Sequence, residues 1–362
     1  MISLDGSHGE GGGQIVRTAL GLSALTGKSF EVVNIRANRP EPGLKNQHRY
    51  GIKAVQELCN AQVEGAEIGS KYLRFEPGKL LAKNLKIDVQ TAGSITLILQ
   101  SVLLPCFFAD KKIKISIKGG TDTLWSMPVD YFREILLFHL KRFADVDFEL
   151  IKRGFFPAGG GEVELDIKQK HKISELSYNF ENFWNELKES NNRIELTEHG
   201  KLLNIRGISS AAKELQRPEV AERQVKAAKM ELSKVGISTD IRAEYTDALS
   251  LGSAIVLWAN YSTKENLDIT SKLGADALGE KGRPADEVGK EAAENLIKEM
   301  NSGAPVDSHL ADNLIPWLGL FGGKIKVSEI TEHTKTNIHI VEQFLGKIFD
   351  VDEKNKIIST KF

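Results

Sequence analysis

Apolar and polar positions alternate along the first half of the chain in an order that occurs twice. The spacing in the first copy predicts a strand at 2–4, a helix at 15–25, a strand at 30–35, a helix at 47–59 and strands at 61–64 and 72–75. The second copy predicts a strand at 85–90, a helix at 94–107, a strand at 112–117, a helix at 128–143 and a hairpin of 147–152 with 162–168. Two copies of one order indicate an internal repeat.

The C-terminal end of the chain resumes this order at its first helix. Residues 311–320, 324–330, 337–344, 348–350 and 356–359 are consistent with a third copy. The opening strand of that copy is not evident in the pattern.

Between these copies the character of the sequence changes. Residues 174–193 are rich in Asn, Glu and Lys around Trp184, and we expect them to form a solvated connector. Beyond them, segments 202–208, 218–235, 239–243, 254–261 and 284–300 have the apolar faces of a self-sufficient α/β unit. We therefore expect a discontinuous core at 1–193 and 303–362, with an inserted α/β domain at 194–302.

The composition indicates a globular protein that does not coat nucleic acid. The 362 residues are 41% hydrophobic and 27% charged, enough for one large or two ordinary domains. Because 48 Lys and Arg balance 49 Asp and Glu, any contact with nucleic acid should be local.

Cysteine usage and hydropathy favour a soluble, cytoplasmic protein without a membrane partner. Cys59 and Cys106 lie in apolar helical segments with no CxxC or His-rich neighbour, which predicts reduced core thiols rather than a disulfide or zinc site. No run of 18 apolar residues and no signal-peptide pattern is present in the sequence.

The first candidate site is a glycine-rich turn, DGSHGEGGGQIVRT, at 5–18. Its glycines permit a tight turn, while Glu10 and Arg17 bring an acid and a fixed positive charge to the start of a helix. This combination suits phosphate binding. The alternative is a strand-to-helix turn whose glycines only allow close packing.

A basic cluster follows at 35–53, IRANRPEPGLKNQHRYGIK. Arg36 and Arg39 flank a proline-containing turn and can offer forked donors to an anion, while Gln47 and His48 open the next helix. A solvated surface loop is the ordinary alternative, but the neighbouring glycine-rich turn favours a functional role.

Two histidines stand out near the C-terminus. His333 lies in TEHTKTN, where hydroxyls and an amide can orient the ring and leave one nitrogen free. His309 opens HLADN and brings an aromatic ring near Asp312 and Asn313, which permits stacking on a base. A structural loop histidine and a packed helix cap remain the alternatives.

Taken together, these segments resemble the RNA 3′-terminal phosphate cyclases in order and spacing up to about Phe344. The matching motifs are GEGGGQIVRTALGLSALTGK, IRANRPEPGLKNQH, QTAGSITLILQ, KGGTDTLWSMPVDYF, FFPAGGGEVEL, LGADALGEKGRPADEVG, HLADN and EHTKTNIHIVEQFL. Segment 174–193 is longer than is usual in that family.

The resemblance implies a ligase-type enzyme of RNA processing that acts in three steps. A histidine takes AMP from ATP, the AMP passes to an RNA 3′-phosphate, and the adjacent 2′-OH closes a 2′,3′-cyclic phosphate. ATP and an RNA 3′-phosphate end would be its substrates, and Mg²⁺ or Mn²⁺ its metal. The oligomeric state is open.

The resemblance also implies roles for individual residues. His333 matches the adenylylated nucleophile, and Glu10 matches the acid that assists the metal. Residues that would hold phosphates are Arg17, Arg36, Arg39, Gln47 and His48. Residues that would contact ATP are Gln100, Met127, Pro128, His309, Leu310, Ala311, Asp312 and Asn313.

The implied fold has three repeated α/β units, each a four-stranded sheet backed by two helices, and a smaller thioredoxin-like insertion. Enolpyruvyl transferases share the repeat architecture, so an enzyme of that type is one alternative. A non-catalytic cyclase-like factor in RNA processing is another, although the presence of His333, Glu10 and Arg17 argues against it.

Overall fold

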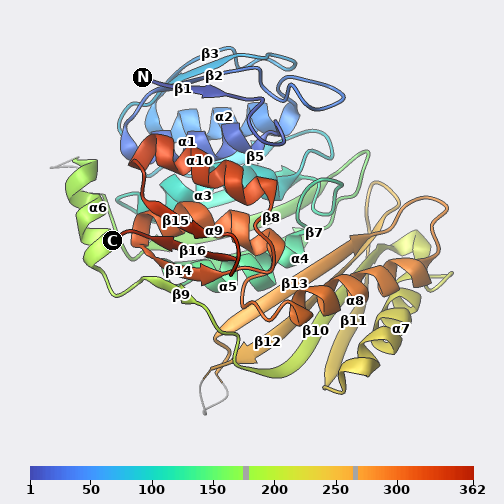
Figure 1. Cartoon of the computed structure of the whole chain (residues 1–362). Coiled ribbons are helices and arrows are strands. Elements are labelled where there is room, and N and C mark those ends of the chain that lie inside the picture. The colour runs from blue at the N-terminus through green and yellow to red at the C-terminus, as the bar shows by residue number, and fades with distance from the viewer. Residues whose placement is uncertain (174–178, 264–267) are drawn as a thin grey trace.

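Three units of one topology form the core of the protein, and a fourth sheet with its own helices stands beside them (Figure 1). The structure is a computed structural model that describes residues 1–173, 179–263 and 268–362. The repeated α/β fold expected from the sequence is confirmed.

The first unit has its strands in the order β1-β2-β4-β3. Strands β1 and β2 are parallel, and the other neighbours are antiparallel. Its elements are β1 (Ile2–Asp5), α1 (Gln14–Thr26), β2 (Phe30–Val33), α2 (Asn46–Cys59), β3 (Gln62–Glu64) and β4 (Leu73–Glu76).

The second unit repeats this arrangement as β5-β6-β8-β7. Its second helix is continuous in space but contains a π-helical turn at Phe132–Leu136 between α4 and α5. The elements are β5 (Leu85–Asp88), α3 (Ile95–Phe108), β6 (Ile113–Gly119), α4 (Val129–Tyr131), α5 (Leu137–Leu140), β7 (Ala144–Lys152) and β8 (Gly161–Gln169).

The third unit takes its opening strand from the far side of the inserted segment. Strand β9 (Ile194–Leu196) pairs in parallel with β14 and completes the order β9-β14-β16-β15. On this pairing we propose that the inserted domain begins after Leu196 rather than at 194. The remaining elements are α9 (Ser308–Phe321), β14 (Gly323–Lys326), α10 (Glu332–Leu345), β15 (Phe349–Asp352) and β16 (Ile357–Thr360).

The inserted segment forms a βαβ-ββα unit with strand order β11-β10-β12-β13, the connectivity of a thioredoxin-like sheet. Its apolar core is separate from that of the repeats. Strand β13 was not predicted, because its small residues have low β propensity. The elements are β10 (Lys201–Ala212), α7 (Val220–Leu232), β11 (Thr239–Thr246), β12 (Ser253–Ser262), β13 (Ser271–Leu278) and α8 (Ala285–Asn301), with 3₁₀ turns at Lys213–Leu215 and Ser233–Val235.

The expectation of a solvated connector at 174–193 was wrong for most of its length. Helix α6 (Phe180–Glu189) buries Phe180, Phe183, Trp184 and Leu187 at helical spacing, and it packs against α9. The indole Nε1 of Trp184 donates a hydrogen bond to the Gly319 carbonyl at 3.2 Å. Residues 174–178 lie outside the described part of the chain.

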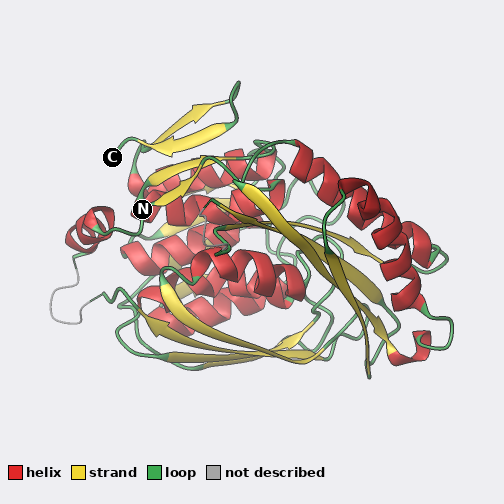
Figure 2. Ribbon diagram, turned by 90° about the horizontal axis from the view of Figure 1, so that it is seen from below, coloured by secondary structure: helices red, strands yellow, loops and turns green. Residues whose placement is uncertain are grey.

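The helices of the three units occupy the centre of the core, and the sheets lie on its outside (Figure 2). Nearly every residue of α1 and α3 is therefore buried, whereas β5 to β8 alternate between buried and exposed positions. Cys59 and Cys106 are buried free thiols, as expected. Within the described residues, no helix combines the length and apolarity needed to cross a bilayer.

Candidate active site

Four helices from all three units meet at one polar region. Helix α1 packs against α3 and α10, and α10 packs against α9. The candidate side chains come from the N-terminal halves of these helices and from the glycine-rich turn before α1. The structure thus brings Glu10, Arg39 and Asp312, which come from separate motifs, close to His333.

His333 lies in the first turn of α10, where the Thr331 side chain caps the helix. Its Nδ1 lies 2.5 Å from Oε1 of Gln14. The Gln14 amide nitrogen lies 3.3 Å from both an Asp312 carboxylate oxygen and the His333 carbonyl, so the amide orientation is fixed and Oε1 must accept from Nδ1–H. In the neutral ring, Nε2 therefore carries the lone pair.

This free nitrogen faces Glu10. The distance from His333 Nε2 to Glu10 Oε2 is 3.1 Å, and the Arg39 guanidinium contacts the same oxygen at 2.9 Å. Burial lowers the pKa of His333, and Arg17 and Arg39 lower it further, against the opposing charge of Glu10. The ring is thus biased toward its neutral, nucleophilic form.

The turn that carries Glu10 depends on its glycines. Gly9 and Gly11 have φ values of 58° and 59°, in the left-handed region. Gly13, directly before α1, lies so close to His48 that a methyl group there would be 2.0 Å from the imidazole Nε2. The glycines therefore allow the backbone to approach the basic cluster. Close packing, the alternative role considered for these glycines, is present at Gly13 and is compatible with a role in binding.

His48 is buried, and its ring faces this turn. Its Nδ1 accepts a hydrogen bond from the Lys45 backbone at 3.0 Å, so Nε2 carries the proton and points at Gly13. Burial, followed by the charge of Arg17, lowers the pKa of His48 to about 3. The ring stays neutral at physiological pH.

Arg36 and Gln47 complete the basic side of the site. Arg36 directs Nη1 to the carbonyls of Glu41 and Gly43, at 2.6 and 2.9 Å, so part of its guanidinium braces the proline-containing turn. Gln47 lies beside the next loop, because a methyl group on Gly93 would be 3.6 Å from its Oε1. Both positions agree with an anion site that extends from the glycine-rich turn.

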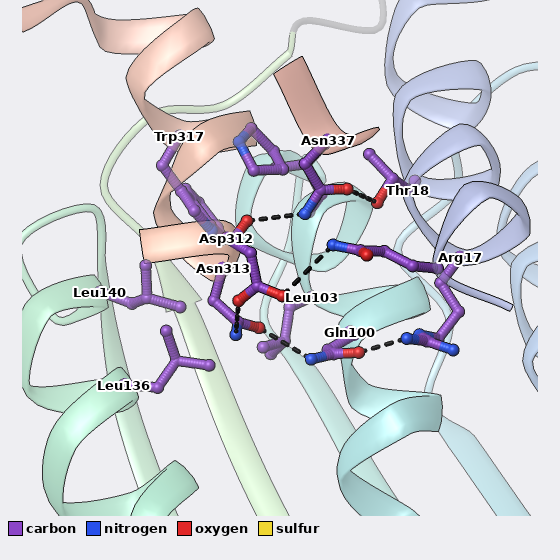
Figure 3. A pocket seen from close by; sticks show the side chains of 14 residues that line it. Arg17, Thr18, Gln100, Leu103, Leu136, Leu140, Asp312, Asn313, Trp317 and Asn337 are labelled. Carbon is purple, nitrogen blue, oxygen red and sulfur yellow. Dashed lines mark hydrogen bonds between the residues drawn. The ribbon is translucent and has the colours of Figure 1, made fainter. Parts of the chain in front are cut away.

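A chain of hydrogen bonds links α1, α3 and α9 on the other side (Figure 3). Arg17 donates from Nε to Gln100 at 2.9 Å, and Gln100 donates to Asn313 at 2.8 Å. Asn313 in turn donates to the Asp312 carboxylate at 2.7 Å. Burial lowers the pKa of Arg17 to about 10, so it remains a cation at neutral pH.

A cavity of about 50 Å³ adjoins this chain, lined on one side by Leu103, Leu136, Leu140 and Trp317 (Figure 3). Such a volume holds water but is far below that of a small-molecule site. The cavity as it stands is too small to hold a nucleotide, and its other side is polar, formed by Gln14, Arg17, Gln100, Asp312, Asn313 and Asn337.

His309, one turn before Asp312 and Asn313 on α9, lies among acidic groups. Burial lowers its pKa, but the charges of Asp276, Asp307 and Asp312 outweigh burial and raise it overall. Burial raises the pKa of Asp312 to about 7 and that of Asp276 to about 6. The Tyr131 ring lies edge-on to His309, with centroids 6.2 Å apart.

The remaining expected nucleotide contacts are placed less directly. Leu310 and Ala311 have fully buried side chains, so only their backbone could touch a nucleotide. Met127 is partly buried against the main core, and Pro128 begins the helix that carries Tyr131. The roles assigned to these residues by resemblance stay predictions.

Sequence reasoning missed two contributors to the site and expected a different contact for a third. Gln14 orients His333, and its signal was its position as the first helical residue after the glycines. Asn337, the amide expected to orient the His333 ring, instead bridges the Asp312 carbonyl and the Thr18 hydroxyl at 2.7 Å each. Asp276 comes from the unpredicted strand β13, so nothing in the pattern connected it with His309.

The side chains of this site fit a metal ion only if substrate phosphates also coordinate it. The described residues contain no group of three or more His, Cys, Asp or Glu side chains able to hold an ion. Within the described residues, the contacts of the Glu10 carboxylate with Arg39 and His333 both use Oε2, so Oε1 is available to an ion. One carboxylate with phosphate oxygens and water is a normal Mg²⁺ environment.

Comparison with known proteins agrees with this arrangement. The family model described as RNA 3′-terminal phosphate cyclase matches residues 8–351. An RNA 3′-terminal phosphate cyclase of Pyrococcus abyssi is 44% identical over 353 residues, which cover 97% of this chain and 95% of that protein. Proteins of the same name from Archaeoglobus fulgidus (42% identity; 99% of each chain) and Methanopyrus kandleri (41%; 95% and 93%) are similarly close. The chain belongs to the RNA 3′-terminal phosphate cyclase family.

Proposed function

We propose that this protein uses ATP to convert an RNA 3′-terminal phosphate into a 2′,3′-cyclic phosphate. The observation that carries the proposal is the position of His333, whose Nδ1 lies 2.5 Å from Gln14 Oε1 and whose Nε2 faces Glu10, itself paired with Arg39. With the ring neutral and its proton on Nδ1, Nε2 has a free lone pair. An imidazole fixed in this tautomer is suited to nucleophilic attack at phosphorus.

In the first step, Nε2 of His333 forms a bond to the α-phosphorus of ATP, and the bond to pyrophosphate breaks. Arg17 and Arg39 supply positive charge beside the site of attack, which favours the developing negative charge. Gln14 keeps the proton on Nδ1, so the attacking nitrogen does not have to lose one first.

In the second step, an oxygen of the RNA 3′-phosphate attacks the same phosphorus, and the P–N bond to His333 breaks. The 3′-phosphate is then activated as a diphosphate linked to AMP. In the third step the adjacent 2′-OH attacks the 3′-phosphorus, loses its proton, and releases AMP. Proximity makes this hydroxyl a strong nucleophile. AMP is also a far better leaving group than an oxygen of the unactivated 3′-phosphate.

Glu10 is the residue that would share a divalent ion with the substrate phosphates, and such an ion would neutralise charge on their oxygens. Arg36, Arg39, Gln47 and His48 would hold the RNA phosphate, because they line the basic side of the turn. On the opposite side, His309 and the hydrogen-bonded pair of Gln100 and Asn313 would hold the nucleoside.

The test is transfer of label from α-³²P-ATP to the protein. The purified protein with ATP and Mg²⁺ should form an acid-labile AMP adduct, which is detected by gel and by intact mass. His333→Ala should abolish the adduct, while His339→Ala, on the next turns of the same helix, should retain it.

Two results would overturn the proposal. An adduct that survives His333→Ala would move the nucleophile elsewhere. A folded protein that binds RNA but forms no adduct would instead be a non-catalytic cyclase-like factor.

A further inference from the structure

Two aromatic side chains project into solvent at the junction of the second repeat and the inserted domain. Trp125 is 90% exposed and Phe156 is 73% exposed. Leu124, Leu249 and Leu251 are also largely exposed and come from the same or adjoining loops. These five residues are called the aromatic rim below.

The loops that carry the rim are in direct contact. Asp122, three positions before Trp125, forms a bridge with Phe155, the residue before Phe156. A methyl group on Gly160 would lie 2.5 Å from Leu249 Cδ1, and the Ala158 amide donates to Ser250 Oγ at 3.0 Å. The loops that carry the rim are therefore neighbours, two from the core and one from the insertion.

This surface is joined to the basic side of the active site by the loop that precedes α3. At one end of that loop, Asn46 at the start of α2 lies 3.4 Å from the Thr91 hydroxyl, and Gln47 lies beside Gly93. The backbone of Thr91 faces the rim loops, because a methyl group on Gly159 would be 2.5 Å from the Thr91 carbonyl. A chain bound by its terminal phosphate near Gln47 could thus run over Thr91 to the rim.

The conformation of Trp125 shows that its exposure is built into the loop. Its φ of 65° is in the left-handed region, which is costly for a bulky residue. The other three tryptophans, Trp184, Trp258 and Trp317, are only 4–7% exposed. A strained backbone thus keeps a large aromatic ring exposed to solvent. Such a ring is suited to stacking against a flat, apolar partner.

We propose that the aromatic rim stacks the bases of the nucleotides that lie 5′ to the RNA terminal phosphate. Stacking on aromatic rings is how proteins bind single-stranded nucleic acid without reading its sequence. It also suits a protein without net positive charge, since affinity then does not depend on many phosphate contacts. This inference rests on the proposed function and gives the inserted domain a part in holding RNA through Leu249 and Leu251.

Trp125 itself supplies a readout that does not require catalysis. Because the other tryptophans are buried, binding of a short 3′-phosphorylated oligoribonucleotide should quench the emission of Trp125. Inorganic phosphate or a nucleoside 3′-phosphate should not quench it, and Trp125→Ala should remove the response. Absence of quenching at oligonucleotide concentrations that saturate binding would overturn the proposal.

Turnover gives a second, separate measurement. Trp125→Ala and Phe156→Ala should raise KM for the oligonucleotide roughly tenfold each. They should not change self-adenylylation or the cyclisation of a nucleoside 3′-phosphate. Met230→Ala removes a side chain that is 76% exposed on α7 and is the matched control.

The outcomes separate the two proposals. If the wild-type protein does not self-adenylylate, the proposed function is wrong. Quenching of Trp125 by the oligonucleotide would still show that the rim binds RNA. An unchanged oligonucleotide KM in both rim variants, with normal self-adenylylation, would refute only the stacking role. Self-association that depends on Trp125 would likewise refute it and mark the rim as a protein-binding surface.

Discussion

The side-chain oxygen of Gln14 lies 2.5 Å from Nδ1 of His333, although the two residues are 319 positions apart in the sequence. The bond joins the first helix of the first repeat to the second helix of the third. Gln14 is therefore a positioning residue that fixes which nitrogen of His333 is free.

Replacing Gln14 should change the pH dependence of self-adenylylation as well as its rate. Gln14→Leu removes a hydrogen bond of about 1.4 kcal/mol and should slow the reaction about tenfold. Gln14→Glu places a carboxylate at Nδ1, favours the imidazolium, and so raises the pKa of His333. The acid limb of the pH profile of the single-turnover rate should then move to higher pH. If the acid limb stays where it is in the wild-type protein, Gln14 has only a packing role.

The two arginines of the basic turn should separate RNA use from ATP use. Arg39→Ala and Arg36→Ala should each raise KM for a 3′-phosphorylated oligonucleotide about tenfold or more, because a charge-assisted bond is lost. Self-adenylylation should fall less. Arg49→Ala, exposed on α2, controls for loss of bulk charge. Equal loss in both steps would assign the arginines to ATP.

Asp312 should make the protein less stable as the pH rises. Its folded pKa of about 7 lies above the ordinary value of 3.8, so the folded state opposes ionisation and stability falls between about pH 4 and pH 7. Asp312→Asn should therefore gain stability relative to wild type at pH 8 but not at pH 4. The gain should be on the order of 1–2 kcal/mol, because partial access to solvent screens the effect.

Denaturant unfolding at both pH values measures this difference. Asp350→Asn, at an exposed position on β15, is the matched control. A difference in unfolding free energy between wild type and Asp312→Asn that is the same at pH 4 and pH 8 would contradict the assignment.

Helix α6 should matter for stability and not for chemistry. Trp184→Ala leaves a cavity and an unpaired Gly319 carbonyl, so the free energy of unfolding should fall by about 3 kcal/mol. Gly319 is near the C-terminal end of α9, about 15 Å along the helix from His309. Self-adenylylation by the folded protein should be unchanged. Asn185→Ala, on the exposed face of α6, should have neither effect.

Much of the fold could be predicted from local pattern, because most helices and strands have their own apolar periodicity. Strand β9 could not, since three residues carry too little signal and their partner strand lies beyond the insertion. Helix α6 was hidden by its polar composition, although Trp184 and its neighbours have helical spacing.

The chemistry of the site was predictable to the extent that it lies in local motifs. Glu10 and His333 were identified from their own segments, and the structure places them 3.1 Å apart. Gln14 and Asp276 were not identified, because their importance comes only from what they meet in space. Contacts between distant elements set the tautomer and the pKa values, and no single segment of sequence contains them.

The first helix of every repeat supplies part of the same site: α1 carries Arg17, α3 carries Gln100 and α9 carries Asp312. No single repeat, and no pair of them, holds the complete set of side chains. If the chain arose by triplication of a smaller ancestor, that ancestor needed three associated subunits to assemble this chemistry. Fusion into one polypeptide would then let the three copies diverge, so that one carries Glu10, another Gln100 and the last His333.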